Sequence, residues 1–239
     1  MKKLWVLIFI IFSADAQAYI PPSQFIIHKM ALKHAGFAGV KLKNKLILQP
    51  SGITFQETVL IDFHARAVRS RISDNTGNEL YVGDHHFGLV DFLLFESNEA
   101  QLSKHLEISD SLWLGRKVET AGTKIAWVLG PKDDSKSQLW IEKDQFLPFR
   151  FLSNGKKIGF QFDSFRFYKE FPYPSLTTSF KMNEKLEEPY YRVELVELHL
   201  IEEAKGLLEL KTKIPSGFTE LGKASSSEIY KFLNDYHKF

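Results

Sequence analysis

Apolar and polar residues alternate along much of this 239-residue chain, a period of two that is typical of strands with one buried face. The run 40–48 places one valine and three leucines on one face and three lysines on the other, and the run 53–63 repeats the pattern with larger side chains. Because a Pro50-Ser51-Gly52 turn separates these two runs, we expect an antiparallel hairpin. Similar runs predict further strands over 66–73, 79–82, 117–129, 138–143, 149–152, 157–168, 175–182 and 191–201.

Two of the long runs change phase partway along. The apolar face switches near Ser164 in one strand and near Val196 in another. A slip of one residue is what a β-bulge produces, and bulges increase the twist of a sheet and curl it. The sequence therefore favours a curved sheet over a flat sandwich.

Three segments show helical spacing instead. The first covers 23–35, with Ser23 as the expected N-cap and Gly36 as the stop, and the second covers roughly 88–106. Ser225 and Glu228 form a capping box for a third, C-terminal helix at about 225–237. The predicted fold class is mainly β with flanking helices (α+β): a highly curved antiparallel sheet forms an incomplete barrel, and helices cover its concave face.

The first eighteen residues predict a signal peptide. Lys2 and Lys3 precede an apolar run over 4–12, and Ala16-Gln17-Ala18 has the small-x-small pattern of a cleavage site. Nine apolar residues span only ~14 Å as a helix, against ~30 Å for a bilayer core. We therefore expect cleavage after Ala18, a single domain over 19–239, a periplasmic or secreted location, and no span of the membrane after cleavage.

The composition of the chain excludes or disfavours several classes of function. The chain has 31 Lys plus Arg and 29 Asp plus Glu, a formal charge of +2, which disfavours a nucleic-acid partner. It has no cysteine, which excludes disulfides, thiolate metal sites and a cysteine nucleophile. Aromatic residues make up 14% of the chain, and that fraction favours sheet structure.

No pattern for metal binding or catalysis emerges. Asp84-His85-His86 is the densest histidine cluster, but adjacent residues diverge on either a strand or a helix, so we expect loop histidines and no metal. The chain lacks a G-x-S-x-G elbow and a Gly-rich phosphate loop. We therefore expect no enzymatic activity and no cofactor.

What remains is more apolar strand surface than three short helices can cover. That surface either closes into a packed core or leaves an apolar hollow, and pattern alone favours neither. In a hollow, burying about fifteen methylenes of an acyl chain would contribute ~12 kcal/mol before association costs. The candidate lining residues are Phe55, Val59, Ile61, Trp127, Trp140, Phe160, Phe162, Val193 and Leu195.

One stretch carries a family resemblance. Leu139-Trp140-Ile141-Glu142-Lys143, Phe146-Leu147-Pro148-Phe149-Arg150 and the Phe171-Pro172-Tyr173-Pro174 step lead into the run 193–200. Together with the order of the predicted elements, they resemble the bacterial outer-membrane lipoprotein carrier and lipoprotein-sorting superfamily (LolA/LolB-like).

The resemblance implies a half-barrel that holds the acyl chain of a lipid or lipoprotein without covalent chemistry. It also implies an arginine that reaches from a strand to hold a helical lid, for which Arg66, Arg69 and Arg71 are the candidates. The alternative is an envelope protein-protein interaction or sensing module built on the same fold.

Overall fold

The computed structural model describes residues 20–49, 51–110, 116–121, 123–130, 137–153, 157–182, 187–205 and 232. The predicted signal peptide and the predicted C-terminal helix lie outside these residues, apart from Phe232. Within the described part of the chain, no helix is long and apolar enough to cross a membrane.

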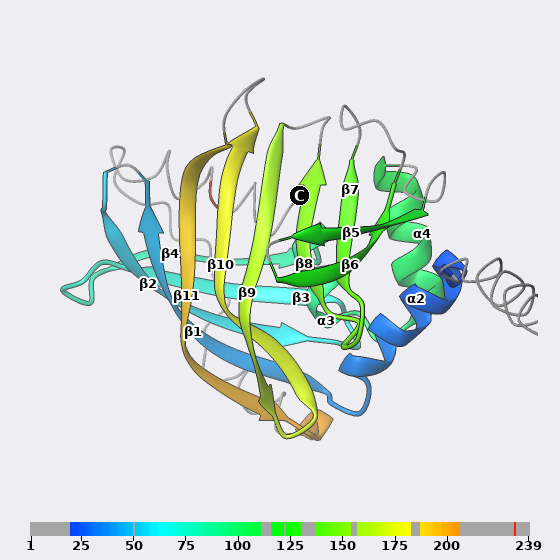
Figure 1. Ribbon diagram of the computed structural model, residues 1–239. Coiled ribbons are helices and arrows are strands. Elements are labelled where there is room, and N and C mark those ends of the chain that lie inside the picture. Colours follow the sequence, from blue (N-terminus) through cyan, green and yellow to red (C-terminus); the bar gives the residue numbers. More distant parts are fainter. Residues whose placement is uncertain are drawn as a thin grey trace, which may run out of the picture.

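The described part of the chain is built around one eleven-stranded antiparallel sheet (Figure 1). The first four strands form a meander, namely β1 (Gly39–Leu48), β2 (Thr54–Asp62), β3 (Ala67–Ser73) and β4 (Glu79–His86). The other seven form a second meander, namely β5 (Arg116–Ala121), β6 (Lys124–Leu129), β7 (Gln138–Glu142), β8 (Pro148–Ser153), β9 (Ile158–Tyr168), β10 (Phe171–Met182) and β11 (Glu187–Ile201). The meanders join where β11 pairs with β1, and the described sheet ends in two edges, β4 and β5. The predicted mainly-β, unclosed antiparallel architecture is confirmed.

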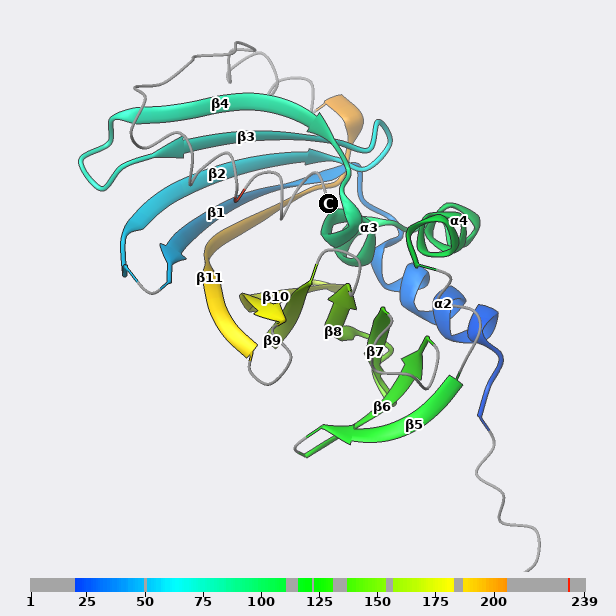
Figure 2. The same ribbon diagram turned by 90° about the horizontal axis from the view of Figure 1, so that it is seen from above.

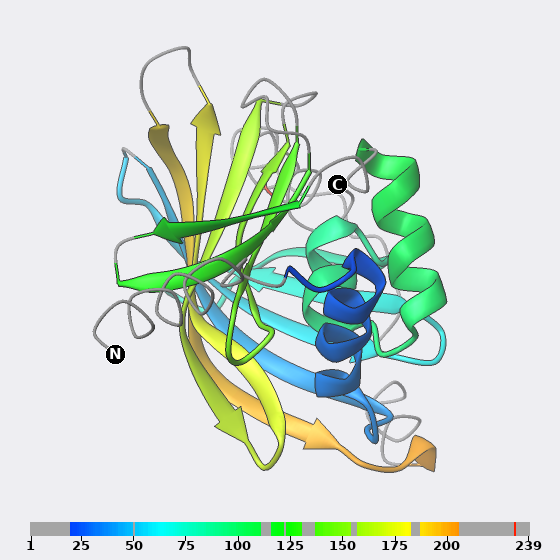
Figure 3. The same ribbon diagram turned by 45° about the vertical axis from the view of Figure 1, so that its right-hand side comes forward.

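Four short helical elements lie at the two ends of the first meander. The α2 helix (Ser23–Ala31) and a 3₁₀ turn (Leu32–His34) precede β1, and α3 (Leu89–Phe95) and α4 (Glu99–Asp110) follow β4. Figure 3 shows α2, α3 and α4 gathered on one side of the sheet. The prediction of Ser23 as N-cap was wrong by one position, because Pro22 precedes the helix and supplies no side-chain cap.

One of the two predicted register slips is present. In the pairing of β1 with β11, Lys43 lies opposite Glu197 and Asn44 lies opposite Leu195, so Val196 bulges out. Ser164 has a φ of 54° inside β9, and Phe167 beyond it turns outward with 53% exposure. The slip predicted near Ser164 was wrong, because β9 pairs with β10 in one register on both sides of this residue. The sheet bends so that its two halves face each other across α3 (Figure 2), and the bulge at Val196 contributes to this curvature.

Two segments differ from their prediction. The run 117–129 is a hairpin of β5 and β6, with Ala121 opposite Lys124, rather than one continuous strand. The β4 strand extends to His86, so Asp84 and the two histidines lie on a strand and not in a loop. Pairing with β3 explains the extension, since Val68 lies opposite His85 and Arg69 lies opposite Asp84.

The sheet is packed on both faces near its β5 end. The main core contains Trp127, Leu139 and Ile141, whereas Ala126 and Val128 form a second cluster that Trp140 packs against. Successive side chains of a strand point to opposite faces, which separates the two clusters. The main core extends across the sheet to α2, α3 and α4.

Candidate ligand-binding site

Eight of the nine predicted lining residues come together on one face. Seven of them are buried members of the main core, and Leu195 packs against it. They come from four strands of both meanders: Phe55, Val59 and Ile61 of β2, Trp127 of β6, Phe160 and Phe162 of β9, and Val193 and Leu195 of β11. We call these eight residues the apolar wall.

Trp140 is set apart from the wall. Its ring packs edge-on against Phe149, with 6.1 Å between the ring centroids, in the second cluster. Phe149 also lines a surface cleft of about 560 Å³, together with Leu147, Phe165, Lys124, Glu142, Gln145, Asp163 and Ser164. The alternation of β7 places Trp140 on the face opposite Leu139 and Ile141, so Trp140 does not belong with the other eight residues.

The α3 helix lies on the main core with nearly its whole surface buried. Six of its seven residues are buried, and Phe92 stacks on His105 of α4 at 3.9 Å between the ring centroids. At its C-terminal end, Phe95 stacks on Phe63 at 5.8 Å and on Tyr173 at 5.6 Å. The short α3 helix therefore joins the two halves of the bent sheet through aromatic contacts.

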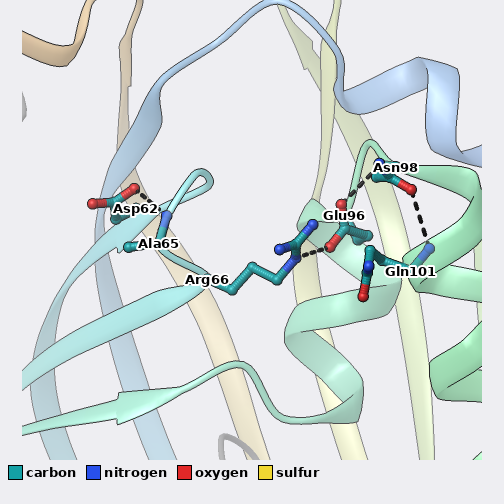
Figure 4. A network of polar contacts seen from close by, with 6 residues as sticks. All are labelled: Asp62, Ala65, Arg66, Glu96, Asn98 and Gln101. Atoms are coloured by element: carbon teal, nitrogen blue, oxygen red, sulfur yellow. Dashed lines mark hydrogen bonds and ion pairs between the residues drawn. The ribbon is translucent and has the colours of Figure 1, made fainter.

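One ion pair ties the end of α3 to the sheet (Figure 4). Arg66 Nε donates to Glu96 Oε2 at 2.5 Å, and Glu96 is only 4% exposed. The other carboxylate oxygen of Glu96 accepts from the backbone N–H of Asn98 at 2.8 Å. Glu96 thus connects the turn between β2 and β3 with the connection between α3 and α4.

Local structure fixes the position of Arg66. Asp62 Oδ1 accepts from the backbone N–H of Ala65 at 2.9 Å, and this bond shapes the turn that Arg66 ends (Figure 4). Arg66 itself has a φ of 49°, and its carbonyl accepts from Phe87 N at 2.9 Å. A positive φ in a non-glycine residue is uncommon and is held here by the surrounding bonds.

The other two candidate arginines stay within the sheet. Arg69 donates to Asp84, and Arg71 pairs with Glu79, so both link β3 to β4 on the surface. The ion pair of Arg66 reaches the connection between two helices, whereas the pairs of Arg69 with Asp84 and of Arg71 with Glu79 lie between two strands.

The main core also contains polar residues that the sequence pattern did not reveal. Asn44, Glu57 and Ser70 lie on β1, β2 and β3 at positions in phase with apolar neighbours, and all three are buried. Asn44 lies directly opposite Glu57 in the sheet. The signal was available, because each residue interrupts an apolar alternation in one of three successive strands.

Burial of His34 makes the stability of the folded protein depend on pH. Its ring is 1% exposed, packs edge-on against Phe171, and has no hydrogen-bond partner for either nitrogen among the described residues. Burial, assisted by the charge of Lys33, lowers the pKa of His34 from 6.5 to about 3. Between these two values the unfolded chain binds a proton that the folded chain excludes.

We therefore expect the free energy of unfolding to fall as the pH drops below 6.5. The loss approaches 1.36 kcal/mol per pH unit, or about 2 kcal/mol at pH 5. Urea denaturation of the wild type and of His34→Leu at pH 7.5 and pH 5 measures the contribution of this residue as a difference. An equal loss in both proteins would contradict the assignment, because the loss would then not come from His34.

The histidines offer no metal site in the part of the chain that the structure describes. No group of three or more His, Asp or Glu side chains there could hold an ion. The closest histidine–carboxylate contacts are surface pairs, such as His28 Nδ1 with Glu99 Oε2 at 2.8 Å, which links α2 to α4.

Comparison with known proteins gives structural likeness only. No family model matches the chain, and no curated protein matches it either. The structure is similar to that of a LolA superfamily protein from Nitrosomonas europaea, with 10% identity and a TM-score of 0.49 over 79% of this chain and 97% of that one. A DUF1329 family protein from Desulfovibrio piger is also similar, with 9% identity and a TM-score of 0.41 over 78% and 100% of the two chains.

A complex of MucA and MucB from Pseudomonas aeruginosa matches more weakly. It has 13% identity and a TM-score of 0.29, and the match covers 77% of this chain and 59% of that one. The Nitrosomonas europaea structure carries the name of the superfamily that the sequence resembles.

Proposed function

We propose that this protein is exported and binds the acyl chain of a lipid or lipoprotein, without covalent chemistry, on the apolar wall beneath α3. The observation that carries the proposal is a largely apolar face, contributed by strands of both meanders, with the seven-residue helix α3 packed on the same main core. A helix that short has little stability of its own, so it depends on its contacts with the sheet.

The α3 helix is attached to the sheet in a way that a ligand could displace. Apart from apolar packing, the C-terminal end of α3 is tied to the sheet through Glu96, which pairs with the half-buried Arg66. When α3 moves away, the main core loses the packing of the Leu and Phe side chains of this helix. An acyl chain would replace them at ~0.8 kcal/mol for each buried methylene.

Ligand displacement tests this function directly. We expect purified protein to bind the uncharged fluorophore N-phenylnaphthylamine and to release it to dodecanol, and native mass spectrometry of gently purified protein to find retained lipid. Val59→Phe should weaken binding at least tenfold, because the added ring occupies space on the wall.

Val128→Phe is the matched control, since it places the same ring at a buried valine of the second cluster. Overpacking costs each variant about 1–3 kcal/mol, so circular dichroism must first show that both are folded. Equal weakening in the two variants, or no fluorophore binding by the wild type, would contradict acyl-chain binding at the wall. If native pull-down returned one defined envelope protein and no lipid, the interaction or sensing alternative would take its place.

A further inference from the structure

Three buried polar side chains lie at one level of the first meander, on the face that carries the apolar wall. Asn44 Nδ2 donates to Glu57 Oε2 at 3.0 Å, and Ser70 Oγ donates to Glu57 Oε1 at 2.7 Å. Asn44 and Glu57 are each 1% exposed, and Ser70 is fully buried. The three residues bring a carboxylate onto an otherwise apolar surface.

The position of Glu57 places this carboxylate within the wall. Along β2 it falls between Phe55 and Val59, two wall residues of the same face. Phe63, which contacts α3, lies six residues further, or ~20 Å at 3.3 Å per residue. The polar group therefore lies near the end of the wall remote from α3.

One atom of the cluster lacks a hydrogen bond. Asn44 donates through its amide nitrogen, but its Oδ1 is buried without any partner among the described residues. Leaving a buried acceptor unpaired lowers stability, and such atoms are rare in native proteins. The missing group is a donor, because Oδ1 can only accept.

We propose that Asn44 and Glu57 recognise the ammonium head of the bound lipid, so that the protein selects acyl chains that carry a primary amine. An N–H of the ligand would donate to Asn44 Oδ1, and the adjacent carboxylate of Glu57 would favour its positive charge. The same carboxylate would repel the ionised head of a fatty acid. This inference rests on the proposed function, since it assigns a head group to the same ligand.

Three probes with one chain length and different heads test the selection. Dodecylamine, dodecanol and dodecanoic acid are each used to displace N-phenylnaphthylamine at about pH 8, where the amine is protonated and the acid is ionised. For the wild type we expect dodecylamine to displace at a concentration at least tenfold lower than dodecanoic acid, with dodecanol between them. Equal potency of the three probes would overturn the inference and leave the proposed function standing.

Single substitutions test which residues produce the preference for the amine probe. Glu57→Gln keeps the side-chain shape and removes the charge, so the preference for amine over alcohol should fall to about twofold or less. Asp84→Asn is the matched control, because its carboxylate pairs with Arg69 on the surface and its loss should leave the preference unchanged. A preference that persists in Glu57→Gln would overturn the inference.

A second variant keeps the test open should Glu57→Gln fail to fold. Asn44→Leu removes the unpaired oxygen, and we expect it to weaken dodecylamine at least threefold more than dodecanol. A cluster that served only to fix strand register would change the unfolding midpoint of these variants and leave the ratio between probes untouched. If none of the probes displaced the fluorophore, the proposed function itself would fall.

Discussion

Replacing Phe171 by alanine is expected to lower the free energy of unfolding by about 4 kcal/mol, more than any other single change considered for this chain. Phe171 begins β10 and is fully buried. Its ring lies 5.7 Å from that of Phe37, 5.8 Å from that of Phe63 and 6.4 Å from that of Phe95. Truncation therefore leaves a cavity where the start of β1, the end of β2 and α3 meet.

Phe167→Ala is the control for this change. Phe167 lies just before Phe171 in sequence, in β9, but its ring is exposed, and its loss should cost less than about 1 kcal/mol. Urea denaturation followed by circular dichroism measures both variants. Similar costs for the two would show that the aromatic cluster around Phe171 is not the packing centre that its contacts indicate.

Replacing Arg66 by methionine is expected to cost about 2–3 kcal/mol and to loosen α3. The substitution leaves the carboxylate of Glu96 buried without its cation, which costs several kcal/mol in a dry site. The partial exposure of Arg66, at 35%, reduces the effect through solvent screening. Amide hydrogen exchange in α3 should accelerate, because the helix loses its polar tie to the β2–β3 turn.

Two comparisons make this prediction specific. Arg69→Met breaks the ion pair with the half-exposed Asp84 and should cost less than about 1 kcal/mol. The double variant Arg66→Met, Glu96→Met should recover part of the loss, because it removes the unpaired charge as well. Should Arg66→Met and Arg69→Met prove equally mild, with exchange in α3 unchanged, Arg66 would have no role in holding the helix.

The strands could be predicted from the sequence because their alternation is local. The hairpin of β1 and β2 and the bulge at Val196 follow from residues within a few positions of each other. The extension of β4 to His86 could not be predicted this way. Its polar residues show no alternation, and their strand conformation depends on pairing with β3.

The candidate site could likewise be predicted only where the signal lies within a single strand. Eight wall residues were identified because each occupies the buried phase of its own strand, whereas Trp140 occupies the other phase of β7. Choosing Arg66 over Arg69 required the position of Glu96, thirty residues away in sequence. Asn44 and Glu57 were missed because a single polar residue hardly disturbs one strand's pattern, and their meaning appears only when the strands are aligned.

The central place of β1 in the sheet has a consequence for how the chain matures. One edge of β1 pairs with β2 at once, but the other waits for β11, so Gly39 meets its partner Ile201 only when most of the polypeptide exists. Contacts of such sequence separation form slowly. Until then, the edge of β1 that will pair with β11 exposes unpaired backbone N–H and C=O groups. Another chain can add a strand to this edge. A newly made copy therefore has to be kept from its neighbours until β11 has been made and has paired with β1.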